Sequence, residues 1–192
     1  MSIATKVKRF LDQNRVGYQI LNHERLMKPL EVIHKLKIPE KELLKAIPIT
    51  DGLTVILAVL PWTYEIDFIS LELALQSRFK ILSLEENHPI FYDCEMGCVP
   101  PFGEAYALGT ILESSLETLE NVYGETGSES ALFQMGMDDF RFLHGGAPLI
   151  SFAYPSAIKN SDEIVMINNE MKELKKNSLY KLWARQLHYI ID

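Results

Sequence analysis

Apolar positions in the first forty-four residues repeat with the spacing of short helices. Ile3, Val7, Phe10 and Leu11 fall on one side of a helix over residues 3–14, and Ser2 is a candidate N-cap. The alternation in residues 18–21 is typical of a short strand. Proline at the start and apolar spacing afterwards predict two further helices. These run over residues 29–36, with Leu30, Ile33 and Leu36 facing inward, and from residue 39 to about residue 44.

Two β-branched and aliphatic segments then predict a hairpin. Residues 45–49 and 53–60 read as strands, and Asp51-Gly52 between them is a strong hairpin signal. The second segment is an almost continuous apolar run, which is typical of a strand buried on both faces. We therefore expect residues 53–60 at the centre of a sheet.

The remaining pattern alternates irregularly between strands and helices. Ser83 and Glu86 form a candidate capping box for one of the helices. The mixture of hairpins and crossovers favours a mixed α/β (α+β) fold, with a curved mixed sheet or open barrel surrounded by helices. The expected segments are a helix over 66–77, a strand over 79–82, strands over 107–112, 121–123 and 130–135, and a helix from 138 or 139 to 143.

A boundary is predicted at Tyr154-Pro155-Ser156. Beyond it, apolar residues from Met171 to Ile190 lie near a helical period. The sequence thus divides into a domain over residues 1–153 and a helical C-terminal extension over residues 154–192. The extension either docks on its own domain or binds a partner protein or a second copy of the chain.

Composition predicts a globular chain with an uneven charge. The 192 residues are 47% apolar, and the two cysteines favour neither a disulfide framework nor a zinc site. Residues 1–50 hold ten Lys/Arg against five Asp/Glu, whereas residues 51–153 hold three against sixteen. A polyanion would therefore meet the N-terminal third, although a solvated basic helix face explains the same count. No apolar run has membrane-spanning length and no signal segment is recognised, so we expect a cytoplasmic location and no membrane contact.

The segment Gly97-Cys98-Val99-Pro100-Pro101-Phe102-Gly103 has the most unusual composition. Proline fixes φ and removes an N–H, while glycine allows backbone angles that other residues avoid. The loop is therefore a preset backbone shape, which can aim N–H groups at a ligand or form a tight buried turn.

Lys45 is the most informative charged residue, because it begins an apolar strand. Its amine either reaches solvent or enters a pocket, where it would seek an anion or a carbonyl oxygen. Familiar nucleotide-binding, hydrolase and metalloprotease motifs are absent, and the five histidines are scattered. We therefore expect neither a metal nor another cofactor.

These features together resemble the YbaK/prolyl-tRNA synthetase editing-domain family of aminoacyl-tRNA deacylases. The specific part is the Gly-x-x-x-Pro loop with the strand lysine upstream. Supporting segments over residues 1–153 are Tyr18–His23, Leu44-Lys45-Ala46, Val55–Pro61, Glu113–Leu116, Gly127-Ser128 and Asp139-Phe140. The resemblance implies hydrolysis, in trans, of the ester that joins a wrong amino acid to the 3′ end of a tRNA, such as tRNA-Pro bearing Ala or Cys.

The resemblance also implies the roles of particular residues. Lys45 would hold the 3′-terminal nucleotide or its phosphate, and the backbone from Gly97 to Pro101 would hold the ester carbonyl and the attacking water. The terminal ribose hydroxyl would assist as base, and the basic N-terminal third would meet the acceptor stem. Expected catalytic residues are thus Lys45, Gly97 and Pro101. Expected substrate-binding residues are His23, Cys98, Val99, Pro100, Phe102, Gly103, Gly127 and Ser128.

The chain departs from the family pattern after the Gly127-Ser128 turn. Many members carry a histidine there, whereas this chain has Glu129 and Ala131. An alternative interpretation is therefore a non-catalytic module that binds an aminoacyl-tRNA end or a nucleotide, with a C-terminal helix that docks a partner.

Overall fold

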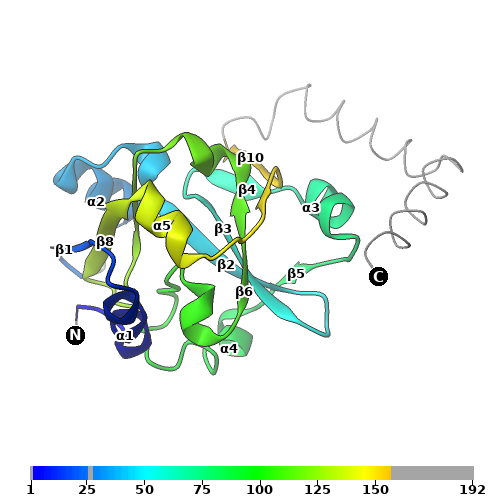
Figure 1. The fold of residues 1–192 in the computed structure, drawn as a ribbon, viewed down its shortest axis with the longest axis horizontal. Helices are drawn as coiled ribbons and strands as arrows, with labels where there is room; N and C mark the ends of the chain where they lie inside the picture. The colour runs from blue at the N-terminus through cyan, green and yellow to red at the C-terminus, as the bar shows by residue number, and fades with distance from the viewer. Residues whose placement is uncertain (1, 26–27, 157–192) are drawn as a thin grey trace, which may run out of the picture. The chain divides into compact units, whose positions relative to one another are not determined.

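The computed structural model describes residues 2–25 and 28–156, and Figure 1 shows the arrangement of the elements. The chain divides after Ala153 into two units, residues 1–153 and 154–192. The predicted helical extension lies mostly at residues 157–192, outside the described residues.

Local sequence signals, a proline and a capping box, mark the start of two of the described helices. Pro29 is the first residue of α2, and the Glu31 carboxylate accepts a hydrogen bond from the Lys28 N–H at 3.0 Å. Ser83 and Glu86 form the expected capping box of α4. The described helices are α1 (Thr5–Asn14), α2 (Pro29–Leu36), α3 (Phe68–Leu75), α4 (Leu84–Asn87) and α5 (Met137–Leu143), with 3-10 helices η1 (Glu40–Glu42), η2 (Gly103–Tyr106) and η3 (Ser114–Thr118).

A five-stranded mixed sheet forms the centre of the fold, in the order β5-β2-β3-β6-β9. β2 and β3 are the predicted hairpin, and β3 lies between β2 and the parallel strand β6, as its apolar composition indicated. The described strands are β1 (Gln19–Asn22), β2 (Leu44–Thr50), β3 (Val55–Pro61), β4 (Tyr64–Ile66), β5 (Lys80–Ile81), β6 (Gly109–Glu113), β7 (Asn121–Glu125), β8 (Ala131–Gly136), β9 (Leu149–Ile150) and β10 (Ala153–Pro155).

A second, antiparallel sheet has the order β1-β8-β7. A bridge between Leu43 and Tyr123 joins its β7 edge to the start of β2, and Leu43 also accepts a backbone hydrogen bond from Trp62 at 2.8 Å. In Figure 1, β1, β8 and α2 lie on the left of the central strands and α3 lies on the right. The junction of the two sheets positions the site described below.

Aromatic side chains form the largest core. Phe102 and Phe133 are fully buried with ring centroids 4.8 Å apart, and Phe140 and Val7 join the same cluster. A smaller cluster beneath α2 contains Val32, Ile33, Leu43 and Leu132. Burial of this apolar surface is the main term that holds the elements together.

The predicted fold class is confirmed, because the described residues form a mixed α+β fold with an open five-stranded mixed sheet. Three local predictions are wrong. Ala4, not Ser2, caps α1, and the third helix is only the 3-10 turn η1. Leu30 is 48% exposed, because Val32 and Ile33 take the inward face of α2. No described helix has the length and apolar character needed to cross a membrane.

Candidate active site

A cavity of about 320 Å³ lies where the two sheets meet. Its walls come from four stretches: the end of β1 with α2, the start of β2 with the residue after β3, the loop after α4, and the β7–β8 region. The lining residues are His23, Pro29, Val32, Leu43, Leu44, Lys45, Trp62, Met96, Gly97, Cys98, Glu125, Ser128, Glu129 and Leu132.

Lys45 reaches this cavity from β2, where it pairs with Leu60 across the hairpin. Burial lowers the pKa of its ammonium below the ordinary lysine value, and the negative charge of Glu65 partly offsets the effect. Lys45 takes part in none of the ion pairs between described residues. The amine is therefore half-desolvated and available to an anion in the cavity.

Gly97 and Cys98 reach the cavity from a tight turn. The Cys98 N–H donates to the Glu95 carbonyl at 3.0 Å, and Gly97 has φ +88°. A type II turn requires this positive φ at its third residue, which explains glycine at the position. Within the described chain, the Gly97 N–H donates to no backbone carbonyl. It remains available to a ligand at the cavity wall.

Glu95 connects this turn to the Gly127-Ser128 turn. Its backbone N–H donates to the Gly127 carbonyl at 2.8 Å, and its carboxylate accepts hydrogen bonds from Ser128 Oγ at 3.1 Å and the Glu129 N–H at 2.5 Å. Arg25 then pairs with both Glu95 and Glu129, at 2.7 and 3.2 Å. The hydrogen bond from the Glu129 N–H is the main cause that lowers the pKa of Glu95. Glu95 thus fixes two walls of the cavity relative to each other.

Glu125, the last residue of β7, brings a buried carboxyl group to the cavity. Its Oε2 has no hydrogen-bond partner in the described structure. Burial raises the pKa of this carboxyl to about 7, with a further contribution from the negative charge of Glu129, while a hydrogen bond with Cys98 opposes the rise. Glu125 is therefore partly protonated near neutral pH.

A comparison of the sequence with known families matches residues 23–143 to the aminoacyl-tRNA editing domain. The chain belongs to this family.

Solved structures with the same fold support the architecture. The hypothetical protein APE2540 is 18% identical, with a TM-score of 0.69 over 78% of this chain and 99% of that chain. A proposed trans-editing enzyme for prolyl tRNA synthetase is 16% identical, with a TM-score of 0.67 over 78% of this chain and 98% of that chain. A proposed signal transduction protein from Marinobacter aquaeolei VT8 is 18% identical, with a TM-score of 0.65 over 88% of this chain and 36% of that chain. No curated protein matches.

Within this editing domain, the structure brings some of the predicted site residues together. Lys45, Gly97, Cys98, His23 and Ser128 all line the cavity. The His23 N–H donates to the Ser130 carbonyl at 2.8 Å, which holds the end of β1 beside the Gly127-Ser128 turn. The roles of these residues stay predictions.

The structure places the other predicted site residues outside the cavity lining. Val99, Pro100, Pro101, Phe102 and Gly103 are all buried. Phe102 packs among the core rings, and a Cβ at Gly103 would lie 2.4 Å from Thr110 Oγ1. The proline-rich part of the loop is therefore packed against the core, and only its first two residues reach the cavity.

Gly127 also lies behind the cavity wall. It has φ +88°, and a Cβ there would lie 2.7 Å from the Ala4 Cβ and 2.8 Å from Cys94 Sγ. Close packing against the N-terminal segment, and not contact with the cavity, explains glycine at this position.

Sequence reasoning missed Glu125 and Trp62. Glu125 ends β7 two residues before Gly127, and a carboxylate between a strand and this turn is the available signal. Trp62 follows β3 and lines the cavity, with its Nε1 buried and without a partner among the described residues. Glu129, where the chain departs from the family pattern, also lines the cavity, and its pairing with distant Arg25 has no local sequence signal.

Cys98 is not poised as a nucleophile. Burial raises the pKa of its thiol, and the negative charges of Glu125 and Glu129 raise it further. The thiolate is therefore scarce at neutral pH. Among the described residues, no group of three or more His, Cys, Asp or Glu side chains is placed to hold a metal ion.

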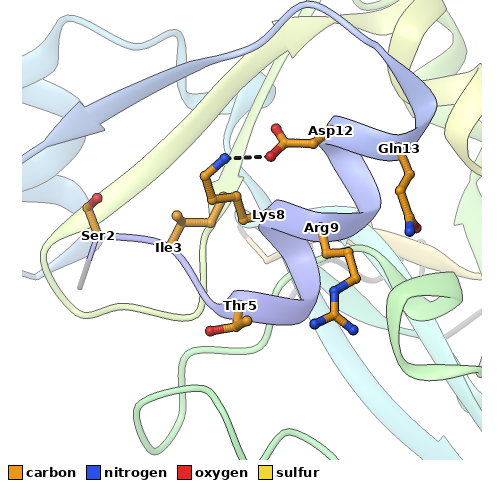
Figure 2. A pocket seen from close by; sticks show the side chains of 7 residues that line it. All are labelled: Ser2, Ile3, Thr5, Lys8, Arg9, Asp12 and Gln13. Atoms are coloured by element: carbon orange, nitrogen blue, oxygen red, sulfur yellow. Dashed lines mark hydrogen bonds and ion pairs between the residues drawn. The ribbon is translucent and has the colours of Figure 1, made fainter.

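A larger hollow of about 670 Å³ lies along α1, and Figure 2 shows the side chains that line it. It shares no residue with the cavity around Lys45. Lys8 and Asp12 within it form an ion pair at 2.5 Å, and both are exposed. This open surface offers no buried polar group for chemistry, so the cavity around Lys45 is the stronger candidate site.

Proposed function

We propose that the protein hydrolyses, in trans, the ester that joins a wrong amino acid to the 3′ end of a tRNA. The chain is a member of the editing-domain family. The observation that carries the proposal is that Lys45 and the Gly97-Cys98 turn line the same cavity. An aminoacyl ester is already activated, so accurate positioning supplies much of the acceleration.

In this proposal Lys45 holds the phosphate of the 3′-terminal nucleotide. Its half-buried amine loses solvation in the empty cavity, and a phosphate oxygen restores a charge partner. A lysine used in this way acts as a point charge with three donors, which suits a phosphate that can approach from several directions.

The Gly97 N–H would hold the ester carbonyl as negative charge develops on its oxygen. Backbone donors are effective here because they are fixed before the reaction starts. The terminal ribose hydroxyl would assist the attacking water. The reaction would therefore need no ionised thiol as nucleophile, in keeping with the protonated state of Cys98. Pro101 would act only by stiffening the loop, since it is buried away from the cavity.

The apolar walls would select the amino acid by size. Val32, Leu43, Trp62 and Leu132 lie around a cavity of about 320 Å³, which favours a small aminoacyl group. Such a filter is worth only about 1–3 kcal/mol for each methylene group. The similarity to a proposed trans-editing enzyme for prolyl tRNA synthetase makes Ala- and Cys-tRNA-Pro the first substrates to test.

The basic N-terminal third would contact acceptor-stem phosphates. Figure 2 shows the Arg9 guanidinium directed away from the Lys8–Asp12 pair. Because phosphate contacts release counterions, binding should weaken steeply as salt is raised.

The decisive experiment is a hydrolysis assay across a panel of mischarged tRNAs that includes Ala- and Cys-tRNA-Pro. Lys45→Ala should lose hydrolysis, whereas Lys41→Ala, a change at an exposed lysine four residues earlier, should retain it. No turnover of any aminoacyl-tRNA by the wild-type protein, or equal turnover by both variants, would overturn the proposal.

A second candidate is a module that binds the aminoacyl end without hydrolysis. The observation that favours it is the acidic wall, where Glu129 is paired with Arg25 at a position close to where many members carry histidine. Saturable binding of aminoacyl-tRNA without turnover would favour this function. The partner-docking helix expected within residues 154–192 lies mostly outside the described residues.

A further inference from the structure

The cavity holds one acidic group, Glu125, that has no cationic partner among the described residues. Of its two glutamates, Glu129 is paired at 3.2 Å with Arg25, which also pairs with Glu95 at 2.7 Å. Glu125 lies in none of the ion pairs of the described residues, and its Oε2 has no hydrogen-bond partner there. Burial disfavours the charged form of a carboxyl in this condition, and an approaching cation offsets that penalty.

The other polar groups of the cavity do not supply that cation. The negative charge that raises the pKa of Lys45 is that of Glu65, and not that of Glu125. The His23 Nδ1 is 2.9 Å from the Glu24 carbonyl oxygen, a contact in which the ring nitrogen donates. The Cys98 thiol remains protonated. Glu125 therefore lines the cavity with a carboxyl that hydrogen-bonds with Cys98 and has one buried oxygen, Oε2, that no described group uses.

An aminoacyl-nucleotide end carries charge at two places, the phosphate and the α-ammonium of the amino acid. The cavity carries Lys45 as its cation and Glu125 as its unmatched acid. We infer that Glu125 binds the α-ammonium group and makes the site selective for aminoacyl over hydroxyacyl or N-blocked acyl groups. The inference rests on the proposed function for the identity of the ligand, but it does not require hydrolysis.

Ionisation of Glu125 on binding has a measurable consequence. The empty site holds a proton on this carboxyl at pH 6, since burial raises its pKa to about 7. An incoming ammonium stabilises the carboxylate, so the proton leaves for the buffer as the charge-assisted hydrogen bond forms. A hydroxyacyl ligand has no ammonium to offer and leaves the proton on Glu125.

The test uses two non-hydrolysable probes, the 3′-amide analogues of alanyl-adenosine and lactyl-adenosine 5′-phosphate. Calorimetry should show the full-length protein binding the alanyl probe about 10- to 100-fold more tightly, which is the usual range for a hydrogen bond to a charged group. In Glu125→Gln this preference should disappear, while Glu117→Gln, at an exposed glutamate, should keep it.

A wild-type measurement covers the case in which Glu125→Gln fails to fold. Titration at pH 6 in two buffers of different ionisation enthalpy should report about one proton more released with the alanyl probe than with the lactyl probe, since the 5′-phosphate common to both probes contributes equally to each. Equal affinity for the two probes, an unchanged preference in Glu125→Gln, or equal proton release would overturn the inference. Glu125-dependent preference without turnover of any mischarged tRNA would support it and overturn only the hydrolytic function.

Discussion

The Glu95 carboxylate accepts a 2.5 Å hydrogen bond from the Glu129 backbone N–H, across thirty-four residues of sequence. The same side chain accepts a hydrogen bond from Ser128 Oγ, and its backbone N–H donates to Gly127. Glu95 also begins the turn that presents Gly97. The geometry of the site therefore depends on a residue outside the cavity lining, at the base of two loops.

Replacement of Glu95 should separate its hydrogen bonds from its surface ion pair. Glu95→Ala removes the acceptor of both turn hydrogen bonds, and we expect a loss of about 2 kcal/mol in the free energy of unfolding. Glu95→Gln keeps an acceptor oxygen and loses mainly the exposed pairing with Arg25, so its loss should be below about 1 kcal/mol. Urea unfolding measures both.

The exposed change Glu85→Ala provides the control for this series. Hydrolysis, or binding of the alanyl probe, should fall in Glu95→Ala more than in Glu95→Gln, because the Gly97 turn loses its support. Equal unfolding free energies for Glu95→Ala and Glu95→Gln would show that the exposed ion pair, and not the turn, carries the contribution of Glu95.

Two glycines with the same backbone angle should respond differently to alanine. Gly97 and Gly127 both have φ +88°, but a Cβ at Gly97 meets no atom within 4 Å, whereas one at Gly127 falls 2.7 Å from the Ala4 Cβ. Gly97→Ala should cost only the conformational term of about 1 kcal/mol. Gly127→Ala adds a steric clash in a packed region and should cost about 3 kcal/mol or more.

The denaturant midpoint at constant m-value measures this difference. Gly97→Ala should remain folded and still lose hydrolysis or ligand binding, because its new methyl group occupies the wall of the cavity. Similar midpoints for the two variants would mean that the Ala4 and Cys94 side chains yield to the added carbon, and that packing does not explain Gly127.

Local signals predicted most of the fold, while the site required the pairing of distant strands. Pro29, the Ser83–Glu86 capping box and the β2–β3 hairpin depend on neighbours a few residues away, and each was correctly predicted. The orientation of Glu125 depends on the pairing of β7 with β8 and on the Leu43–Tyr123 bridge between the sheets. A sequence pattern over five residues contains no information about which end of such a strand faces a cavity.

The Gly97–Gly103 loop is a second case in which the local sequence predicts the backbone shape but not which residues face the cavity. Its composition indicated a rigid backbone, and the turn at Gly97 agrees with that interpretation. Which residues of a rigid loop face the cavity depends on what packs behind it. Phe102 lies against Phe133, Phe140 and His144, so the loop is anchored through its aromatic residue and presents its glycine end to the site.

The free energy of unfolding should decrease as the pH rises, because Glu125 must ionise inside the folded protein. Its pKa is about 7 in the folded protein and near 4.5 in the unfolded chain, so the folded state binds more protons between these values. The stabilising contribution is complete below pH 4.5 and is lost as the pH rises through 7. Glu125→Gln keeps a neutral side chain at every pH, and should therefore unfold with nearly the wild-type free energy at pH 4.5.

At pH 8 the two proteins should differ, with Glu125→Gln more stable by about 3 kcal/mol, which corresponds to the size of the pKa shift. Chemical denaturation at pH 4.5, 6 and 8 tests this, with Glu117→Gln as the exposed control. Parallel pH profiles for the wild type and Glu125→Gln would show that water or a conformational change solvates the carboxylate. In that case the carboxyl would be ionised before any ligand arrives, and binding of an ammonium group at pH 6 would release no proton from it.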